Sequence, residues 1–175
     1  MDLLFHMLIP FMLAIIAGVD PKKALLLTPI AIIPDLDLLL TGHRVYLHSI
    51  FIPLTIILIS LLLKLKQKNP HHNLLVLASL YYLSHLLLDL SGPVAILWPL
   101  TTVGYGIAIG ITVSQTSIFP TIQPYLSLNV EEIPLPNVVT EGAIATPQSI
   151  TIALLFFVVL VFTYRDRIPR FYTSS

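Results

Sequence analysis

Seven ionisable side chains lie inside or at the ends of apolar stretches, where a charge is costly and is therefore usually kept for a function. All seven are histidines or aspartates, whose imidazole nitrogens and carboxylate oxygens suit zinc and related divalent ions. They are His6, Asp35, Asp37, His43, His48, His85 and Asp89. The set predicts a metal site.

The spacing of two pairs favours shared coordination. His85 and Asp89 are four residues apart and would share one face of a helix. Asp35 and Asp37 would diverge on a regular helix, but Pro34 and the end of the helix allow both carboxylates to turn toward one site. Each pair also has a simpler interpretation. The first could be a polar pair that joins two helices, and the second a solvated helix end.

The remaining histidines are weaker signals when each is taken alone. His43 and His48 bracket a short loop, which could be an ordinary interfacial loop in which His48 caps the next helix. His6 lies near the start of the first apolar segment, where a histidine needs no metal. The metal interpretation gains from their combination, because every simpler explanation would have to hold at the same time.

Composition indicates a membrane protein, since 56% of the 175 residues are hydrophobic and only 10% are charged. We predict an all-α fold, a polytopic membrane helix bundle of about five spans with one extracytoplasmic proline-rich lobe. The formal net charge is zero, so nucleic acid is not an expected partner. The chain contains no cysteine, which excludes disulfides and thiolate ligands.

Breaks in the apolar pattern set the predicted organisation. The spans are predicted over residues 3–19, 24–40, 49–63, 74–90 and 150–164. Residues 1–113 would form the membrane helical domain with the metal site, 114–148 an extracytoplasmic connection, and 149–175 the final transmembrane helix and a basic cytoplasmic tail. The glycine-containing stretch 94–113 is ambiguous between a sixth span, a re-entrant segment and an interfacial hairpin.

Orientation follows from three basic clusters that should face the cytoplasm. These clusters are Lys22 and Lys23, then Lys64, Lys66 and Lys68, then Arg165, Arg167 and Arg170. Five spans satisfy all three clusters with the N-terminus outside and the C-terminus inside, which favours a non-crossing 94–113. All seven candidate ligands then fall at the outer face of the cell membrane.

The ordered motifs of the first hundred residues resemble a known family. They are His6, Pro34-Asp35-Leu36-Asp37, His43-Arg44, His48-Ser49, Tyr82-Leu83-Ser84-His85-Leu86-Leu87-Leu88-Asp89 and Leu97-Trp98-Pro99. In this order they are similar to the membrane-bound metal-dependent hydrolases, the LexA-regulated inner-membrane hydrolases of bacteria and archaea. That family usually carries Arg-Gly-x-Thr-His-Ser in the loop, whereas this chain reads His43-Arg44-Val45-Tyr46-Leu47-His48-Ser49. The resemblance implies a hydrolase.

A hydrolytic metal centre would work here with one or two divalent ions, zinc preferred and manganese or iron possible. Arg44 is the fixed positive charge beside the ligands, and its planar fork suits a phosphate or carboxylate, so we predict a catalytic role for it. A membrane lipid with a phosphoester is the expected substrate class. Two alternatives stay open: a metal-ion transporter, and a non-catalytic scaffold with a structural metal whose 114–148 lobe binds a protein partner. The sequence does not indicate the oligomeric state.

Overall fold

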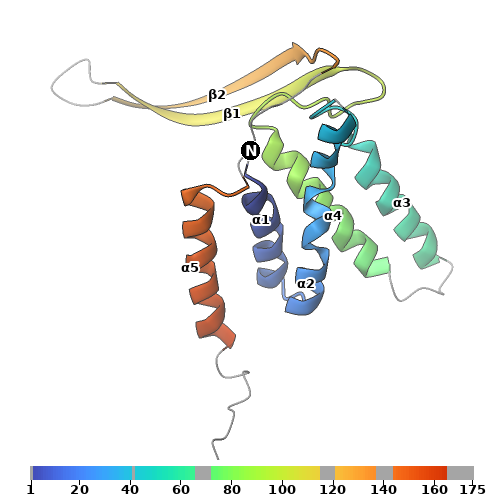
Figure 1. Ribbon diagram of the computed structural model, residues 1–175, viewed down its shortest axis with the longest axis vertical. Coiled ribbons are helices and arrows are strands. Elements are labelled where there is room, and N and C mark those ends of the chain that lie inside the picture. The colour runs from blue at the N-terminus through green and yellow to red at the C-terminus, as the bar shows by residue number, and fades with distance from the viewer. Residues whose placement is uncertain (1, 41, 66–71, 115–120, 137–143, 165–175) are drawn as a thin grey trace, which may run out of the picture.

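The computed structural model describes residues 2–40, 42–65, 72–114, 121–136 and 144–164. Helices and one two-stranded antiparallel sheet make up this part of the chain (Figure 1). The α-helices are α1 (Leu3–Ile16), α2 (Pro21–Leu27), α3 (Phe51–Leu65), α4 (His72–Asp89) and α5 (Pro147–Tyr164). Two 3-10 helices are η1 (Thr28–Ile32) and η2 (Pro34–Leu40), and the strands are β1 (Val103–Ser114) and β2 (Thr121–Glu132).

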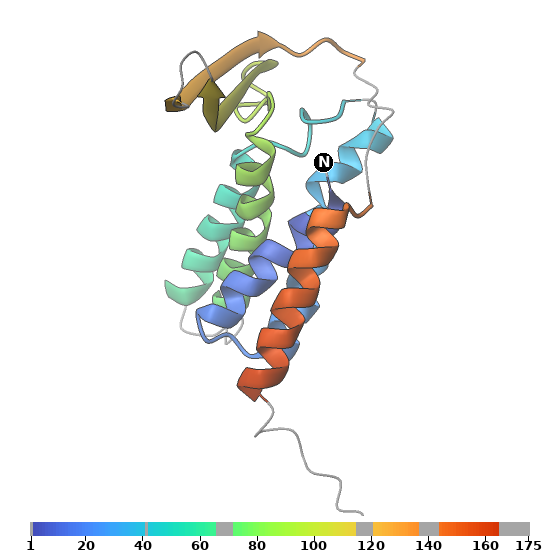
Figure 2. The same ribbon diagram turned by 90° about the vertical axis from the view of Figure 1, so that its left-hand side faces the viewer.

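The helices pack side by side around small and aromatic residues (Figures 1 and 2). Small side chains such as Ala24 and Ala31 are fully buried and allow α2 and η1 to approach α1 and α4 closely. The hydroxyl of Tyr81 on α4 donates a hydrogen bond of 2.9 Å to the Ala24 carbonyl oxygen. Phe11 on α1 meets Phe156 on α5 edge to face. These contacts fix α1 and α4 as the central pair, and both carry candidate ligands.

The segment predicted as a span over 24–40, with a break near Pro34, is divided into three short helices. Pro29 and Pro34 each lack a backbone N–H and cannot continue an α-helical ladder, so α2 gives way to η1 and then η2. The tighter 3-10 turns carry Asp35 and Asp37 in the first turn of η2. Asp37 is thereby fully buried while Asp35 keeps 23% of its side-chain surface exposed.

The sheet contradicts the all-α prediction. In β1 the even positions 104–110 are glycine or alanine and the odd positions 105–113 are larger apolar residues, a period of two that is typical of a strand. Its partner β2 falls inside the stretch predicted as a connection, and the register pairs Gly106 with Asn129 and Ile109 with Leu126. The two strands lie across the end of the helices at which α1 begins (Figure 1). Residues 94–113 therefore contain a loop and most of β1, one strand of a hairpin whose other strand lies at 121–132, outside that stretch.

The prediction of a polytopic bundle with about five spans is wrong for a second reason. In the described part of the chain, no helix has both the length and the apolarity that a membrane crossing requires. A crossing helix needs about 20 residues, most of them apolar, whereas α1 is 14 residues long and α3 is 15 residues long. The apolar run that begins with α1 extends beyond the helix, which ends before Gly18, where the backbone turns with a φ of 81°.

Candidate metal centre

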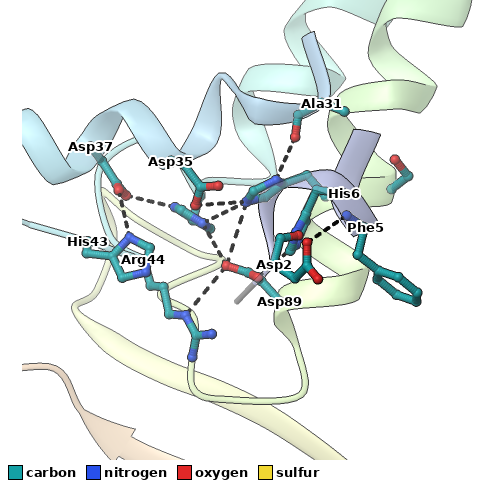
Figure 3. Close-up of polar contacts among 12 residues, drawn as sticks. Asp2, Phe5, His6, Ala31, Asp35, Asp37, His43, Arg44 and Asp89 are labelled. Carbon is teal, nitrogen blue, oxygen red and sulfur yellow. Dashed lines mark hydrogen bonds and ion pairs between the residues drawn. The ribbon is translucent and has the colours of Figure 1, made fainter. Parts of the chain in front are cut away.

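Candidate ligands from four segments meet at the end of the helices that the hairpin covers (Figures 1 and 3). His6 comes from α1, Asp35 and Asp37 from η2, and His85 and Asp89 from α4. His43 and His48 come from the loop between η2 and α3. All seven belong to one connected network of side-chain contacts. Three helical segments and one loop, far apart in sequence, therefore bring all seven predicted ligands to one place.

The Asp89 carboxylate lies at the centre of this network. Its Oδ1 is 3.1 Å from Nε2 of His6, and its Oδ2 is 3.0 Å from Nε2 of His48. Nε2 of His85, one turn earlier on α4, is 3.6 Å from the same Oδ2. All four side chains are at most 1% exposed. Three imidazoles thus present the same ring nitrogen to one buried carboxylate.

The other ring nitrogen, Nδ1, of each of these histidines faces an oxygen that can only accept a hydrogen bond. The acceptors are the Asp2 carbonyl at 2.9 Å from His6, the Ala31 carbonyl at 2.6 Å from His85, and the Asp37 carboxylate at 2.7 Å from His48. Nδ1 must therefore carry a proton, so that in the neutral form of each ring the Nε2 lone pair is directed at the centre. Metal-binding histidines are held in this way.

The distances between the Nε2 and carboxylate atoms suit a bound ion. Nε2 of His48 and Nε2 of His85 are 3.2 Å apart, a contact that needs a proton or a cation between the two lone pairs. Two nitrogens on one tetrahedral zinc, each at about 2.0–2.1 Å, are themselves about 3.3 Å apart. Asp35 Oδ1 lies 3.5 Å from Nε2 of His85. Together, Asp35, His48, His85 and Asp89 form a group that could hold a metal ion, with ligand atoms within 4.8 Å of one another.

Asp37 and His43 lie one step away from this group. The Asp37 carboxylate accepts from Nδ1 of His43 at 3.2 Å and from the backbone N–H of Val45 at 3.2 Å, besides its bond to His48. Both of its oxygens are thus engaged in holding the 43–48 loop. Burial lowers the pKa of His48, but its bonds to Asp37 and Asp89 outweigh burial and raise the pKa to about 8.

Arg44 closes the network on its exposed side. Its Nε is 3.5 Å from Asp89 Oδ2, is buried and has no hydrogen-bond partner, while the side chain as a whole is 20% exposed. The residue has a φ of 63°, a left-handed conformation that turns the loop at this point. A Cβ on Gly92 would lie 2.2 Å from Nη1 of Arg44. Gly92 therefore leaves the space that the guanidinium fills.

Sequence reasoning overlooked Asp2 and Gly92. Nothing in the sequence connects Gly92 with the loop that carries Arg44. Asp2 does carry a local signal, since an aspartate directly before an apolar helix is a favoured N-cap. Its side chain accepts from the backbone N–H of Phe5 at 3.1 Å (Figure 3).

Comparison with known proteins decides the family. The family profile described as YdjM inner membrane protein matches residues 1–168. The chain belongs to this family. The YdjM assignment makes it a member of a family of inner membrane proteins, in agreement with the membrane location predicted from composition. No curated protein and no solved structure matches the chain.

The YdjM match extends well past the motifs noted in the sequence. It covers the hairpin and α5 as well as every candidate ligand. Residues 114–168, which lie beyond the motifs of the first hundred residues, are therefore part of the family's common sequence.

Proposed function

We propose that this protein is a metal-dependent hydrolase of the membrane that acts on a phosphoester lipid. The observation that carries the proposal is the convergence of three Nε2 atoms on Asp89, each on a ring whose Nδ1 is held by an oxygen acceptor. His48, His85 and Asp89 would bind the ion, with Asp35 at the position that is open to water and His6 as a further donor beside them. The nitrogen and oxygen donors and the near-tetrahedral spacing suit zinc best, while manganese or iron would also fit.

The exposure of the site favours catalysis over a structural staple. A structural zinc is enclosed by its ligands, whereas a catalytic one keeps a position open to water. Here three donors are buried, but Asp35 is 23% exposed and Arg44 is 20% exposed, so the group is accessible from one side. A transporter would need polar groups that continue along the helices. Away from the site, the buried polar side chains on the described helices are Thr28, Ser60, Ser79 and Ser149, of which Thr28 and Ser79 donate to carbonyl oxygens.

The two side chains at the open side would bind the substrate and transfer the proton. Arg44 would bind the anionic phosphoryl oxygens of the substrate through its guanidinium. A bound divalent ion would supply Lewis-acid activation of the water and of the phosphoryl group. As the water oxygen bonds to phosphorus, Asp35 would accept the water proton and return it to the alkoxide released from the broken P–O ester bond.

Two features support a lipid as the substrate. The family is one of inner membrane proteins, and a groove of about 370 Å³ runs between α1 and α4, the helices that carry His6 and Asp89. Apolar residues such as Leu13 and Leu80 line this groove. Its volume lies within the range of small-molecule sites, and its lining suits an acyl chain.

The positions of the basic residues support activity at the outer face. Lys22 and Lys23 begin α2 and Lys64 lies near the end of α3, at the helix ends opposite the hairpin and the metal centre (Figure 1). Basic residues favour the cytoplasmic side. We therefore propose that the metal centre faces outward; Lys66, Lys68 and the basic cluster after 164 lie outside the described residues.

The test is hydrolysis of phosphoester lipids in mixed micelles by purified protein supplied with zinc or manganese. Wild type should release phosphate or a phosphorylated headgroup, and His85→Ala should not. Arg44→Gln should retain metal but lose most of the turnover. Asp20→Asn is a matched control, because Asp20 caps α2 away from the site. Equal turnover by wild type and His85→Ala would overturn the proposal.

A further inference from the structure

The beginning of α5 is tied to the beginning of the chain by Asp2. Asp2 Oδ2 accepts from the Thr146 backbone N–H at 2.7 Å and from the Thr146 hydroxyl at 2.5 Å. The backbone reinforces this contact, because Leu4 N–H donates to the Ile144 carbonyl at 3.0 Å. We call this set of bonds the Asp2–Thr146 clasp. It joins residues that are 144 positions apart.

The clasp and His6 share the same residue. While the Asp2 carboxylate binds Thr146, the Asp2 carbonyl oxygen accepts from Nδ1 of His6 at 2.9 Å. That bond fixes which His6 nitrogen carries the proton and directs Nε2 at Asp89, 3.1 Å away. The position of the Asp2 peptide therefore sets the orientation of the His6 ring.

A capping bond alone would not need the distant partner. Asp2 Oδ1 already accepts from the Phe5 N–H, which suffices to begin α1. The second oxygen is used entirely on the segment before α5. Ser149 supports that segment, because its hydroxyl lies 3.0 Å from the Thr146 N–H and donates to the Thr146 carbonyl at 2.9 Å. Hydrogen bonds from Ser149 and Thr146 also outweigh burial and lower the pKa of Asp2 to about 2, so the carboxylate stays charged.

We propose that Asp2 and Thr146 are positioning residues of the metal centre, through which α5 holds His6 in its ligand orientation. The proposal rests on the metal site proposed above. It gives the C-terminal helix a role in the chemistry, although α5 contributes no ligand. Partners that orient metal ligands typically change metal affinity by about 10- to 100-fold when they are removed.

The experiment is a double-mutant cycle read out as zinc affinity, by competition with a chromophoric chelator, on full-length protein tagged at the C-terminus. Asp2→Ala should weaken zinc binding by about 10- to 100-fold, and Thr146→Val should weaken it by a smaller factor. Thr146→Ser keeps the hydroxyl and should bind zinc with the affinity of wild type. Thr151→Val is the matched control, because the Thr151 hydroxyl bonds only within α5, to the Pro147 carbonyl.

The decisive arm repeats Asp2→Ala in a His6→Ala background, in which the group of Asp35, His48, His85 and Asp89 remains. A positioning role predicts that Asp2→Ala then has no further effect on affinity. An equal loss in both backgrounds would show that Asp2 serves only the stability of the fold and would overturn the inference. Zinc binding unaffected by Asp2→Ala would overturn the inference while leaving the proposed function intact. Wild type that binds no zinc would overturn both.

Discussion

Asp37→Asn tests whether the Asp37 carboxylate, which is not itself a ligand, sets the metal affinity of the group through its bond to His48. Asp37 is fully buried and accepts at 2.7 Å from Nδ1 of His48. The amide keeps the size of the side chain but loses its charge. It therefore orients the His48 imidazole less firmly and makes Nε2 a weaker electron-pair donor to the metal. Loss of such a partner should weaken metal binding by about 10- to 100-fold.

The same substitution also has an effect that strengthens metal binding and that depends on pH. Asp37 helps to raise the pKa of His48 to about 8, so at pH 7 only about a tenth of His48 is neutral and able to bind metal. If the pKa returned to its ordinary value of about 6.5, about three quarters would be neutral, a gain of up to about eightfold. At pH 8.5 the corresponding gain is only about 1.3-fold. The defect of the variant should therefore be up to about six times larger at pH 8.5 than at pH 7.

The assay is zinc competition with a chromophoric chelator in detergent at both pH values, with Asp20→Asn as the carboxylate control. Variant and wild type that bind equally at pH 8.5 would refute the orienting role of Asp37. A defect of the same size at both pH values would refute its part in raising the pKa of His48.

Four further outcomes follow from the geometry. Because the pKa of His48 is raised to about 8, protons compete with the metal below that pH, and zinc affinity of wild type should rise by about an order of magnitude from pH 6.5 to 8.5, against about twofold for an ordinary histidine. Arg44→Lys should keep zinc but lower kcat/KM for an anionic ester, since a point charge replaces the planar fork. Gly92→Ala should displace the guanidinium and lower turnover with zinc content unchanged, as measured by elemental analysis. Tyr81→Phe removes the bond to Ala24 and should lower the free energy of unfolding by about 1 kcal/mol without changing zinc affinity, as measured by chemical denaturation.

The candidate ligands could be found from the sequence because ionisable residues are rare in apolar segments. His85 and Asp89 could even be paired, since a separation of four places both on one helix face. The sequence does not show which candidates face the metal position and which, like Asp37 and His43, only support the ligands. Asp37 differs from Asp35 in its burial and in the neighbours of its carboxylate, and both are set by the 3-10 turns after Pro34 and by the course of the 43–48 loop.

The fold was predicted less well than the ligands. Apolarity alone does not separate strand from helix, so the stretch 94–113 stayed ambiguous, although the alternation of small and larger residues within β1 is typical of a strand. Its partner β2 is a sequence of mixed polarity that becomes a strand only by pairing with β1. The Asp2–Thr146 clasp depends on a contact across nearly the whole chain, which one sequence cannot reveal.

Elemental analysis of the detergent-purified protein, with no metal added during purification, tests the central claim most directly. Wild type should contain a stoichiometric divalent metal, most readily zinc, and both His85→Ala and Asp89→Ala should lose it while Asp20→Asn retains it. Wild type that contains no metal, with the variants folded normally by circular dichroism, would contradict the account. The buried histidines and aspartates would then serve only as polar contacts between the helices.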